Sequence, residues 1–332
     1  MSHYSLNPHY AEDDVKQEPN RAGFGRGLKQ AGENNQSVVA LCADLTESTQ
    51  MHLFRDAFPN RFVEVGVAEQ NLVTVASGMA RAGKIPFTAS YAAFSPGRNW
   101  EQIRTTICLN DQPVKIVGAH AGVSVGPDGA THQMLEDIAL MRVLPNMVVV
   151  APGDSIEAEK ATLLLAENNK PSYIRLAREK SPIFSTENSP FEIGKAYVLR
   201  QGSDVSLLGT GPMTYQLLML ARLLDLQGIH AEVVHVPTIK PLDEATILDS
   251  IRKTGRAVTA EEAQIAGGFG GAVSELLSEK MPTPLFRIGI QDHFGESGTP
   301  AELLETFGLT ADTMLSSIVD FLKRVPQYKP GY

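Results

Sequence analysis

The sequence has few cysteines: Cys42 and Cys108 are the only two among its 332 residues. So small a number excludes a disulfide framework and a zinc cluster built from thiolates. Both cysteines lie within apolar runs, where a free cysteine behaves as a small buried hydrophobic residue. We therefore expect two buried thiols rather than a disulfide-stabilised domain or a cysteine metal motif.

An excess of positive charge is also lacking. Lys and Arg number 29 against 38 Asp and Glu, which gives a formal net charge of −9. This balance argues against nucleic acid or an anionic membrane as the main partner. It leaves room for a local basic pocket that binds a phosphorylated metabolite.

No apolar stretch approaches the length that a membrane span requires. Residues 1–20 are polar, with mixed charge, and they lack the apolar core of a signal peptide. We expect a soluble, cytoplasmic protein in which residues 1–20 form a polar N-terminal arm or a disordered lead.

Short β-rich runs alternate with helical runs over residues 21–180, which predicts an α/β domain with a mostly parallel sheet covered by helices on both faces. The predicted strands are Ser37–Cys42, Phe62–Val65, Ile85–Ser90, Val114–Ala119, Met147–Ala151 and Ser172–Leu176. The predicted helices include Arg21–Gly32, Ala68–Ala82, Arg98–Leu109 and Ser155–Glu167.

Residues 181–191 interrupt this alternation, because Pro182 and Pro190 flank a polar stretch that is typical of a linker. A second βα series over residues 192–332 predicts a smaller, doubly wound α/β domain. Its predicted strands are Val205–Leu208, Ala231–Val236, Ala257–Ala260 and Leu285–Ile288. Its predicted helices are Tyr215–Gln227, Leu242–Lys253, Gly270–Lys280, Ala301–Phe307 and Ala311–Lys323.

Polar and aromatic residues follow several strands of the first series. Ligands of open parallel sheets gather beyond the carboxyl ends of the strands, so side chains placed there are candidates for one site. The residues in these positions are Asp44, Glu69, Tyr91, Phe94, His120 and Arg178.

Glu69 is the most informative of them. It follows the run Phe62–Val65 and a glycine turn, and it opens an apolar helix, where a carboxylate is stabilised by the helix dipole and the free N–H groups. Capping alone would explain an isolated glutamate. The small apolar residues that follow place this helix start near a core, which favours a functional carboxyl group.

A glycine-rich loop, residues 122–133, follows His120 and carries Asp128 and His132. It lacks the Gly-Lys-Ser/Thr ending of a phosphate-binding loop. The irregular spacing of the three polar residues gives no metal signature, so no metal site is predicted. Contact with a polar ligand is the favoured interpretation.

Taken together, these motifs resemble the transketolase family over nearly the whole chain. The segments that carry the resemblance are Val67–Asn71, Ala89–Phe94, Trp100–Arg104, His120–Asp137, Glu261–Glu262, Gly267–Gly270 and Phe294–Gly298. The resemblance implies a pyrimidine-binding domain, a C-terminal domain, and dependence on thiamine diphosphate.

One departure from the family pattern concerns the first domain of a complete transketolase. That domain holds the cofactor diphosphate and Mg²⁺ through a Gly-Asp-Gly motif, which is absent here; Gly153-Asp154-Ser155 is the nearest match. The chain thus resembles the C-terminal half of a split transketolase of the pentose phosphate pathway. The resemblance then implies a separate diphosphate-binding subunit, which mainly binds the Mg²⁺, and an α₂β₂ assembly.

The resemblance also implies roles around the cofactor. Glu69 matches the family glutamate that bonds N1′ of the pyrimidine and favours the reactive tautomer. Phe94 and Tyr91 resemble the aromatic wall that stacks on this ring, although core packing would also explain Tyr91. Asp44 resembles a residue at the rim of the cofactor site, or alternatively a turn residue.

Roles toward the sugar are implied in the same way. His132 and His120 resemble the histidines that handle hydroxyl protons. Asp128 resembles the residue that contacts a C2 hydroxyl. Ser48, Arg98 and Arg178 resemble the phosphate end of the substrate channel, where arginine gives a bidentate fit. These residues imply ketol transfer between sugar phosphates.

Four alternatives remain open. The chain could belong to a 2-oxoacid dehydrogenase as its β subunit, or resemble 1-deoxyxylulose-5-phosphate synthase. It could act on an unusual sugar phosphate. It could also be a non-catalytic regulatory relative, since fold alone does not imply activity.

Overall fold

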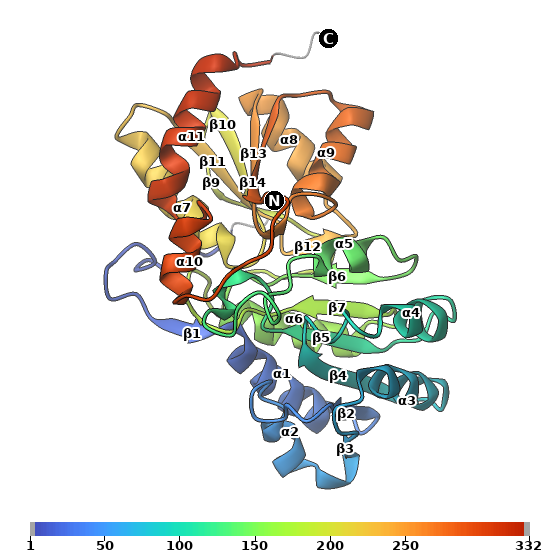
Figure 1. Ribbon diagram of the computed structural model, residues 1–332. Coiled ribbons are helices and arrows are strands. Elements are labelled where there is room, and N and C mark those ends of the chain that lie inside the picture. The colour runs from blue at the N-terminus through green and yellow to red at the C-terminus, as the bar shows by residue number, and fades with distance from the viewer. Residues whose placement is uncertain (1–3, 329–332) are drawn as a thin grey trace.

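The computed structural model describes residues 4–328 and contains two main sheets flanked by helices (Figure 1). The seven-stranded sheet has the order β12-β6-β7-β5-β4-β2-β3, and all of its neighbouring pairs are parallel except β12 with β6. The five-stranded sheet has the order β14-β13-β10-β11-β9, with only β9 antiparallel to its neighbour. The predicted fold class of two mostly parallel α/β sheets is confirmed.

The strands of the seven-stranded sheet are short and mostly buried, as expected when helices cover both faces. They are β2 (Val38–Cys42), β3 (Phe62–Glu64), β4 (Ile85–Tyr91), β5 (Lys115–Ala119), β6 (Val148–Val150), β7 (Ser172–Arg175) and β12 (Thr238–Lys240). The helices of this part are α1 (Asn20–Asn34), α2 (His52–Ala57), α3 (Glu69–Arg81), α4 (Trp100–Gln102), α5 (Asp137–Arg142) and α6 (Ser155–Glu167). A π-helical turn at Ile103–Cys108 continues α4, and 3₁₀ turns lie at Pro59–Arg61 and Val123–Val125.

The second sheet contains β9 (Tyr197–Arg200), β10 (Val205–Gly209), β11 (Ala231–His235), β13 (Ala257–Gln264) and β14 (Leu285–Ile290). Its helices are α7 (Met213–Asp225), α8 (Glu244–Thr254), α9 (Phe269–Lys280), α10 (Pro300–Thr306) and α11 (Ala311–Arg324). The α8 and α9 helices pack on one side of this sheet and α7 and α11 on the other (Figure 1). Within residues 4–328, no helix combines the length and the apolar character that a membrane crossing needs.

The N-terminal segment does not form a disordered lead from Tyr4 onward. Strand β1 (Gln17–Pro19) pairs antiparallel with β8 (Lys180–Pro182), which lies partly inside the predicted linker. Tyr4 is buried, and its hydroxyl donates to Glu157 Oε1 at 2.6 Å. The composition of this segment is polar, but a few anchoring side chains are enough to order it against the rest of the chain.

A buried polar network joins the two halves. Glu157 Oε2 lies 2.7 Å from His235 Nε2, and His235 Nδ1 lies 2.6 Å from the Thr214 hydroxyl. Asp154 caps α6 and accepts hydrogen bonds from the backbone N–H groups of Phe184 and Ser185. Burial raises the pKa of the Asp154 carboxyl to about 6. Because these groups come from the first half, the linker region and the second half, the network fixes the three segments together.

Candidate active site at the carboxyl edge of the first sheet

Four rings gather where β4 and β5 end. Tyr91 is the last residue of β4, and its ring stacks on His120, which follows β5, at a centroid distance of 3.9 Å. Phe94 lies 5.9 Å from Tyr91 and meets His132 edge-on at 5.4 Å. The Tyr91 hydroxyl donates to Ser48 Oγ at 3.0 Å. The structure therefore brings together five of the residues singled out in the sequence.

His120 occupies an unusual position. It has a positive φ of 57°, a left-handed conformation that non-glycine residues adopt rarely and that is enriched at functional sites. Its side chain is buried, and its Nδ1 has no hydrogen-bond partner within the described chain. Burial, aided by the positive charges of Arg21 and Arg178, lowers the pKa of His120 to about 3. The imidazole is therefore neutral near pH 7 and can accept a hydrogen bond.

A basic group lies beside these rings. Arg178 Nη1 donates to the carbonyl of Val125 at 2.5 Å and lies 3.5 Å from Asp128 Oδ2. Arg21 Nη1 donates to the carbonyl of Ser48 at 2.6 Å, and its buried Nε has no partner among the described residues. Burial, with the nearby charge of Arg178, lowers the pKa of Arg21. Two guanidinium groups with unused donors can bind a phosphate.

The sequence reasoning missed Arg21. A signal was present, because Arg21 stands in the first turn of α1, where the helix dipole disfavours a cation. A basic residue in that unfavourable place suggests that an anion or another group outside the helix compensates.

Glu69 opens α3 and is 5% exposed. Its two carboxylate oxygens lie 3.3 and 3.5 Å from Arg98 Nη1, and the Arg98 guanidinium lies 4.2 Å from the centroid of the Phe94 ring. Asn99 Nδ2 donates to the Glu69 carbonyl at 2.9 Å. Arg98, which was expected beside Ser48 and Arg178, thus lies against Glu69 and Phe94.

Asp44 lies in a left-handed turn, with φ of 61° and an exposed side chain. Its N–H donates to Glu64 Oε1 at 2.7 Å, and the same oxygen accepts from Gly66 N–H at 3.0 Å. Glu64 therefore holds the turns that follow β2 and β3. A role for Asp44 at the rim of the site stays a prediction.

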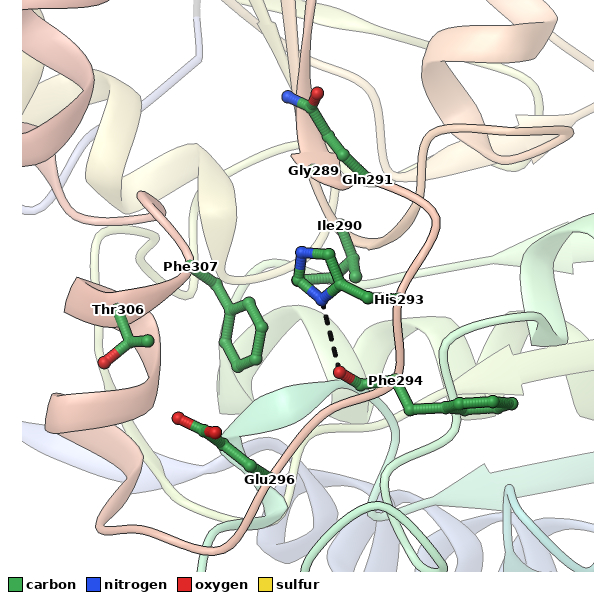
Figure 2. A pocket seen from close by; sticks show the side chains of 8 residues that line it. All are labelled: Gly289, Ile290, Gln291, His293, Phe294, Glu296, Thr306 and Phe307. Carbon is green, nitrogen blue, oxygen red and sulfur yellow. Dashed lines mark hydrogen bonds between the residues drawn. The ribbon is translucent and has the colours of Figure 1, made fainter.

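A separate pocket of about 520 Å³ lies at the carboxyl end of β14. In Figure 2, the ring of His293 faces that of Phe307, and Glu296 lies below them on the chain segment that leads to α10. Phe294 points away from these rings and is exposed. The pocket belongs to the second sheet and contains none of the predicted site residues.

Comparison with known proteins assigns the two parts of the chain. Residues 17–182 match the transketolase pyrimidine-binding domain, and residues 194–314 match the transketolase C-terminal domain. A pyrimidine-binding domain followed by this C-terminal domain defines a class of thiamine diphosphate-dependent proteins.

Individual relatives extend over nearly the full chain. A Methanocaldococcus jannaschii protein assigned as a transketolase C-terminal section is 42% identical over 307 residues, covering 92% of this chain and 96% of that protein. The 6-deoxy-6-sulfo-D-fructose transketolase subunit SqwH of a Clostridium species is 41% identical, with 90% and 92% covered. A solved split-gene transketolase, described as an inactive β4 tetramer, is 43% identical with a TM-score of 0.87, covering 93% of this chain and 99% of that chain. The chain belongs to the transketolase family and corresponds to its C-terminal half.

The residues present fit the aminopyrimidine half of thiamine diphosphate. A buried carboxyl group, Glu69, lies beside the face of Phe94, and Arg98 fills the space between them with a planar cation. An aminopyrimidine ring is also planar, and it could likewise lie over Phe94 and bond the Glu69 carboxyl. Among residues 4–328, no group of three His, Cys, Asp or Glu side chains is arranged to hold a metal ion.

Proposed function

We propose that this chain is a subunit of a transketolase that transfers a two-carbon ketol unit from a ketose phosphate to an aldose phosphate. The observation that carries the proposal is the buried carboxyl of Glu69, which is linked through Arg98 to Phe94 of the four-ring group formed with Tyr91, His120 and His132. A carboxyl, an aromatic wall and two imidazoles are the groups that this reaction needs from the pyrimidine side.

Glu69 would hold a proton at N1′ of the pyrimidine, and Phe94 and Tyr91 would contact its ring. When bound, thiamine diphosphate supplies a nucleophilic carbon and an electron sink for cleaving a carbon–carbon bond. Binding would require Arg98 to leave Glu69. Arg98 can move away because its side chain is 53% exposed, and the pyrimidine would replace it as the partner of the buried Glu69 carboxyl.

The two histidines would act on the hydroxyl groups of the sugar. The low pKa of His120 keeps its imidazole neutral, so it would accept a hydrogen bond from a hydroxyl rather than carry the full proton. His132 Nδ1 lies 2.9 Å from the Thr131 hydroxyl, which orients its Nε2 for a substrate. General acid–base groups of this kind contribute about 10²–10⁴-fold to rate.

The anionic end of the sugar would bind near Arg178, Arg21 and Ser48, with Asp128 contacting a hydroxyl. A sulfonate, like a phosphate monoester, is a tetrahedral anion with three terminal oxygens that arginine can bind, although it carries one negative charge and the phosphate nearly two. The relative SqwH is named for 6-deoxy-6-sulfo-D-fructose, so a sulfosugar is a second candidate donor. Comparing kcat/KM for a ketose phosphate with that for the sulfosugar separates the two.

The proposal includes a partner. A separate subunit with a Gly-Asp-Gly motif would bind the diphosphate and Mg²⁺, in an α₂β₂ assembly located in the cytoplasm. Support comes from the absence of that motif from this sequence and from the similarity to a split-gene transketolase.

The experiment is affinity capture of the tagged chain from its native lysate with thiamine diphosphate and Mg²⁺, followed by a ketose-to-aldose transfer assay. A stoichiometric partner with Gly-Asp-Gly and two-carbon transfer are expected. Decarboxylation of a 2-oxoacid by the captured complex would move the chain to the dehydrogenase or deoxyxylulose-phosphate synthase branch. Capture of no partner would favour a non-catalytic role.

A further inference from the structure

The glycine-rich loop that carries Asp128 and His132 has little structure of its own. Besides the 3₁₀ turn at Val123–Val125, its internal backbone bonds are local turns, such as Gly129 N–H to the Gly126 carbonyl at 3.1 Å. The first half of the chain adds two bonds near the start of the loop, from Gly122 N–H to the Met134 carbonyl at 2.9 Å and from Arg178 Nη1 to the Val125 carbonyl at 2.5 Å. The loop nevertheless has to hold a hydroxyl-binding carboxylate and an imidazole in place against the first sheet.

The second sheet supplies further anchors. The buried Glu262, in β13, accepts a hydrogen bond from Ser124 N–H at 2.6 Å through its Oε1. Gln264, at the end of the same strand, donates its N–H to the Leu135 carbonyl at 2.8 Å. One strand of the C-terminal half thus binds both ends of the loop.

Gln133 provides a third anchor from the side of the loop. Its side chain is 4% exposed, and its Nε2 donates at 2.8 Å to the Glu296 carbonyl, on the segment between β14 and α10 that Figure 2 shows. The same Nε2 lies 3.2 Å from the carbonyls of Val123 and Gly126. Gln133 therefore connects the start of the loop to the C-terminal half.

The loop and the C-terminal half pack closely against each other at this junction, with glycine backbone against a side chain on each side. A Cβ on Gly122, whose φ is 91°, would overlap the Glu262 carboxylate, and a Cβ on Gly295 would overlap the Gln133 side chain. Beneath the junction, the buried Arg175 donates to the Glu262 carbonyl and to Asp137 Oδ2, each at 2.8 Å. Glu262 is thus held in place from the first sheet while it holds the loop.

We propose that Glu262 and Gln133 are positioning residues for the active-site loop, so that the C-terminal domain sets the placement of Asp128 and His132. The role in catalysis rests on the proposed function, whereas the anchoring of the loop is independent of it. The domain would then act in the reaction by holding the loop in place.

The chain offers a matched control one residue away. Glu261 is equally buried and also accepts backbone N–H groups, from Phe269 at 2.6 Å and Gly270 at 2.7 Å, but these belong to α9 and not to the loop. Glu261→Met and Glu262→Met therefore remove the same kind of acceptor from two different segments. Glu262→Gln restores an acceptor oxygen at the second position.

The first test is hydrogen exchange of the full-length chain. Glu262→Met is expected to speed exchange over residues 122–133 at least about tenfold, Glu262→Gln to recover most of the protection, and Glu261→Met to speed exchange only at the start of α9. Equal loop exchange in Glu261→Met and Glu262→Met would overturn the proposal. If Glu262→Met does not fold, Gln133→Leu serves in its place, with Gln264→Leu as its control.

The second test uses the complex with the partner subunit. Glu262→Met is expected to lower kcat about tenfold or more at an unchanged cofactor requirement, with rescue by Glu262→Gln and less than about a twofold change for Glu261→Met. A freed loop with undiminished kcat would overturn the positioning role. A wild-type complex without transfer activity would refute the proposed function, and the exchange result would still decide whether the loop is anchored.

Discussion

The two sheets of this chain share an architecture but use their carboxyl edges differently. Beyond β4 and β5 of the first sheet, rings, imidazoles and guanidinium groups converge with unused hydrogen-bonding atoms. In the C-terminal part of β13 of the second sheet, Glu261 accepts hydrogen bonds from two backbone N–H groups and Glu262 from one. Burial raises the pKa of Glu261 to about 7, but its partners are all within the fold. A parallel sheet thus offers a place for chemistry, and the side chains at its edge decide whether the place is used.

The largest expected effect concerns Glu69. Glu69→Ala should abolish ketol transfer by the reconstituted complex, a loss on the order of 10²–10⁴-fold or more, because the carboxyl that would bond the pyrimidine is removed. Unfolding of the variant, followed by circular dichroism, should stay close to wild type. Glu101→Ala, which removes an exposed carboxylate on α4, is the control. An active Glu69→Ala complex would refute the mechanism and remove the contrast between the two edges.

The next effect concerns the buried polar network that joins the two halves. Tyr4→Phe should lower the free energy of unfolding by about 1.5–3 kcal/mol, because the buried Glu157 carboxylate loses a hydrogen bond at 2.6 Å. Urea unfolding measures the change, and Tyr328→Phe, at an exposed tyrosine near the other end, is the control. Equal stability of wild type and Tyr4→Phe would show that the N-terminal segment contributes nothing to holding the halves together.

A third effect follows from the buried, neutral His120. Its folded pKa, about 3, lies below the ordinary value of 6.5. The contribution of neutral His120 to the free energy of unfolding is therefore fully present above pH 6.5 and is lost as the pH falls toward 3. Between pH 7.5 and pH 5, wild type should lose about 2 kcal/mol more than His120→Asn, since each unit corresponds to about 1.4 kcal/mol. Asparagine tolerates the positive φ at this position. Parallel pH profiles in urea unfolding would contradict the low pKa.

The smallest effect is expected at Arg98. Because its contact with Glu69 is half exposed, Arg98→Ala should change the free energy of unfolding by less than about 1 kcal/mol. In the complex, it should alter the dissociation constant of thiamine diphosphate less than about tenfold, and titration calorimetry measures this. A rise in KM for the sugar phosphate with unchanged cofactor affinity would instead assign Arg98 to the phosphate end.

Much of the fold could be predicted from the sequence, because buried parallel strands appear as short apolar runs between amphipathic helices. Strands β1, β8, β9 and β12 were missed, because segments of three or four residues are too short to give a periodic signal. The gathering of Tyr91, Phe94, His120 and Arg178 at one edge followed from the rule for parallel sheets. The placement of Arg98 and the contribution of Arg21 could not be predicted, because both depend on contacts between residues that are distant in the sequence.

Strand β12 has a consequence for how the chain can be divided. It comes from the C-terminal half, yet it pairs with β6 and covers the outer edge of the first sheet. A fragment cut at the linker would therefore leave β6 as a bare edge strand of three valines, a template for pairing between molecules. The two domains recognised by sequence similarity thus depend on each other, and the first domain produced alone would carry a risk of aggregation.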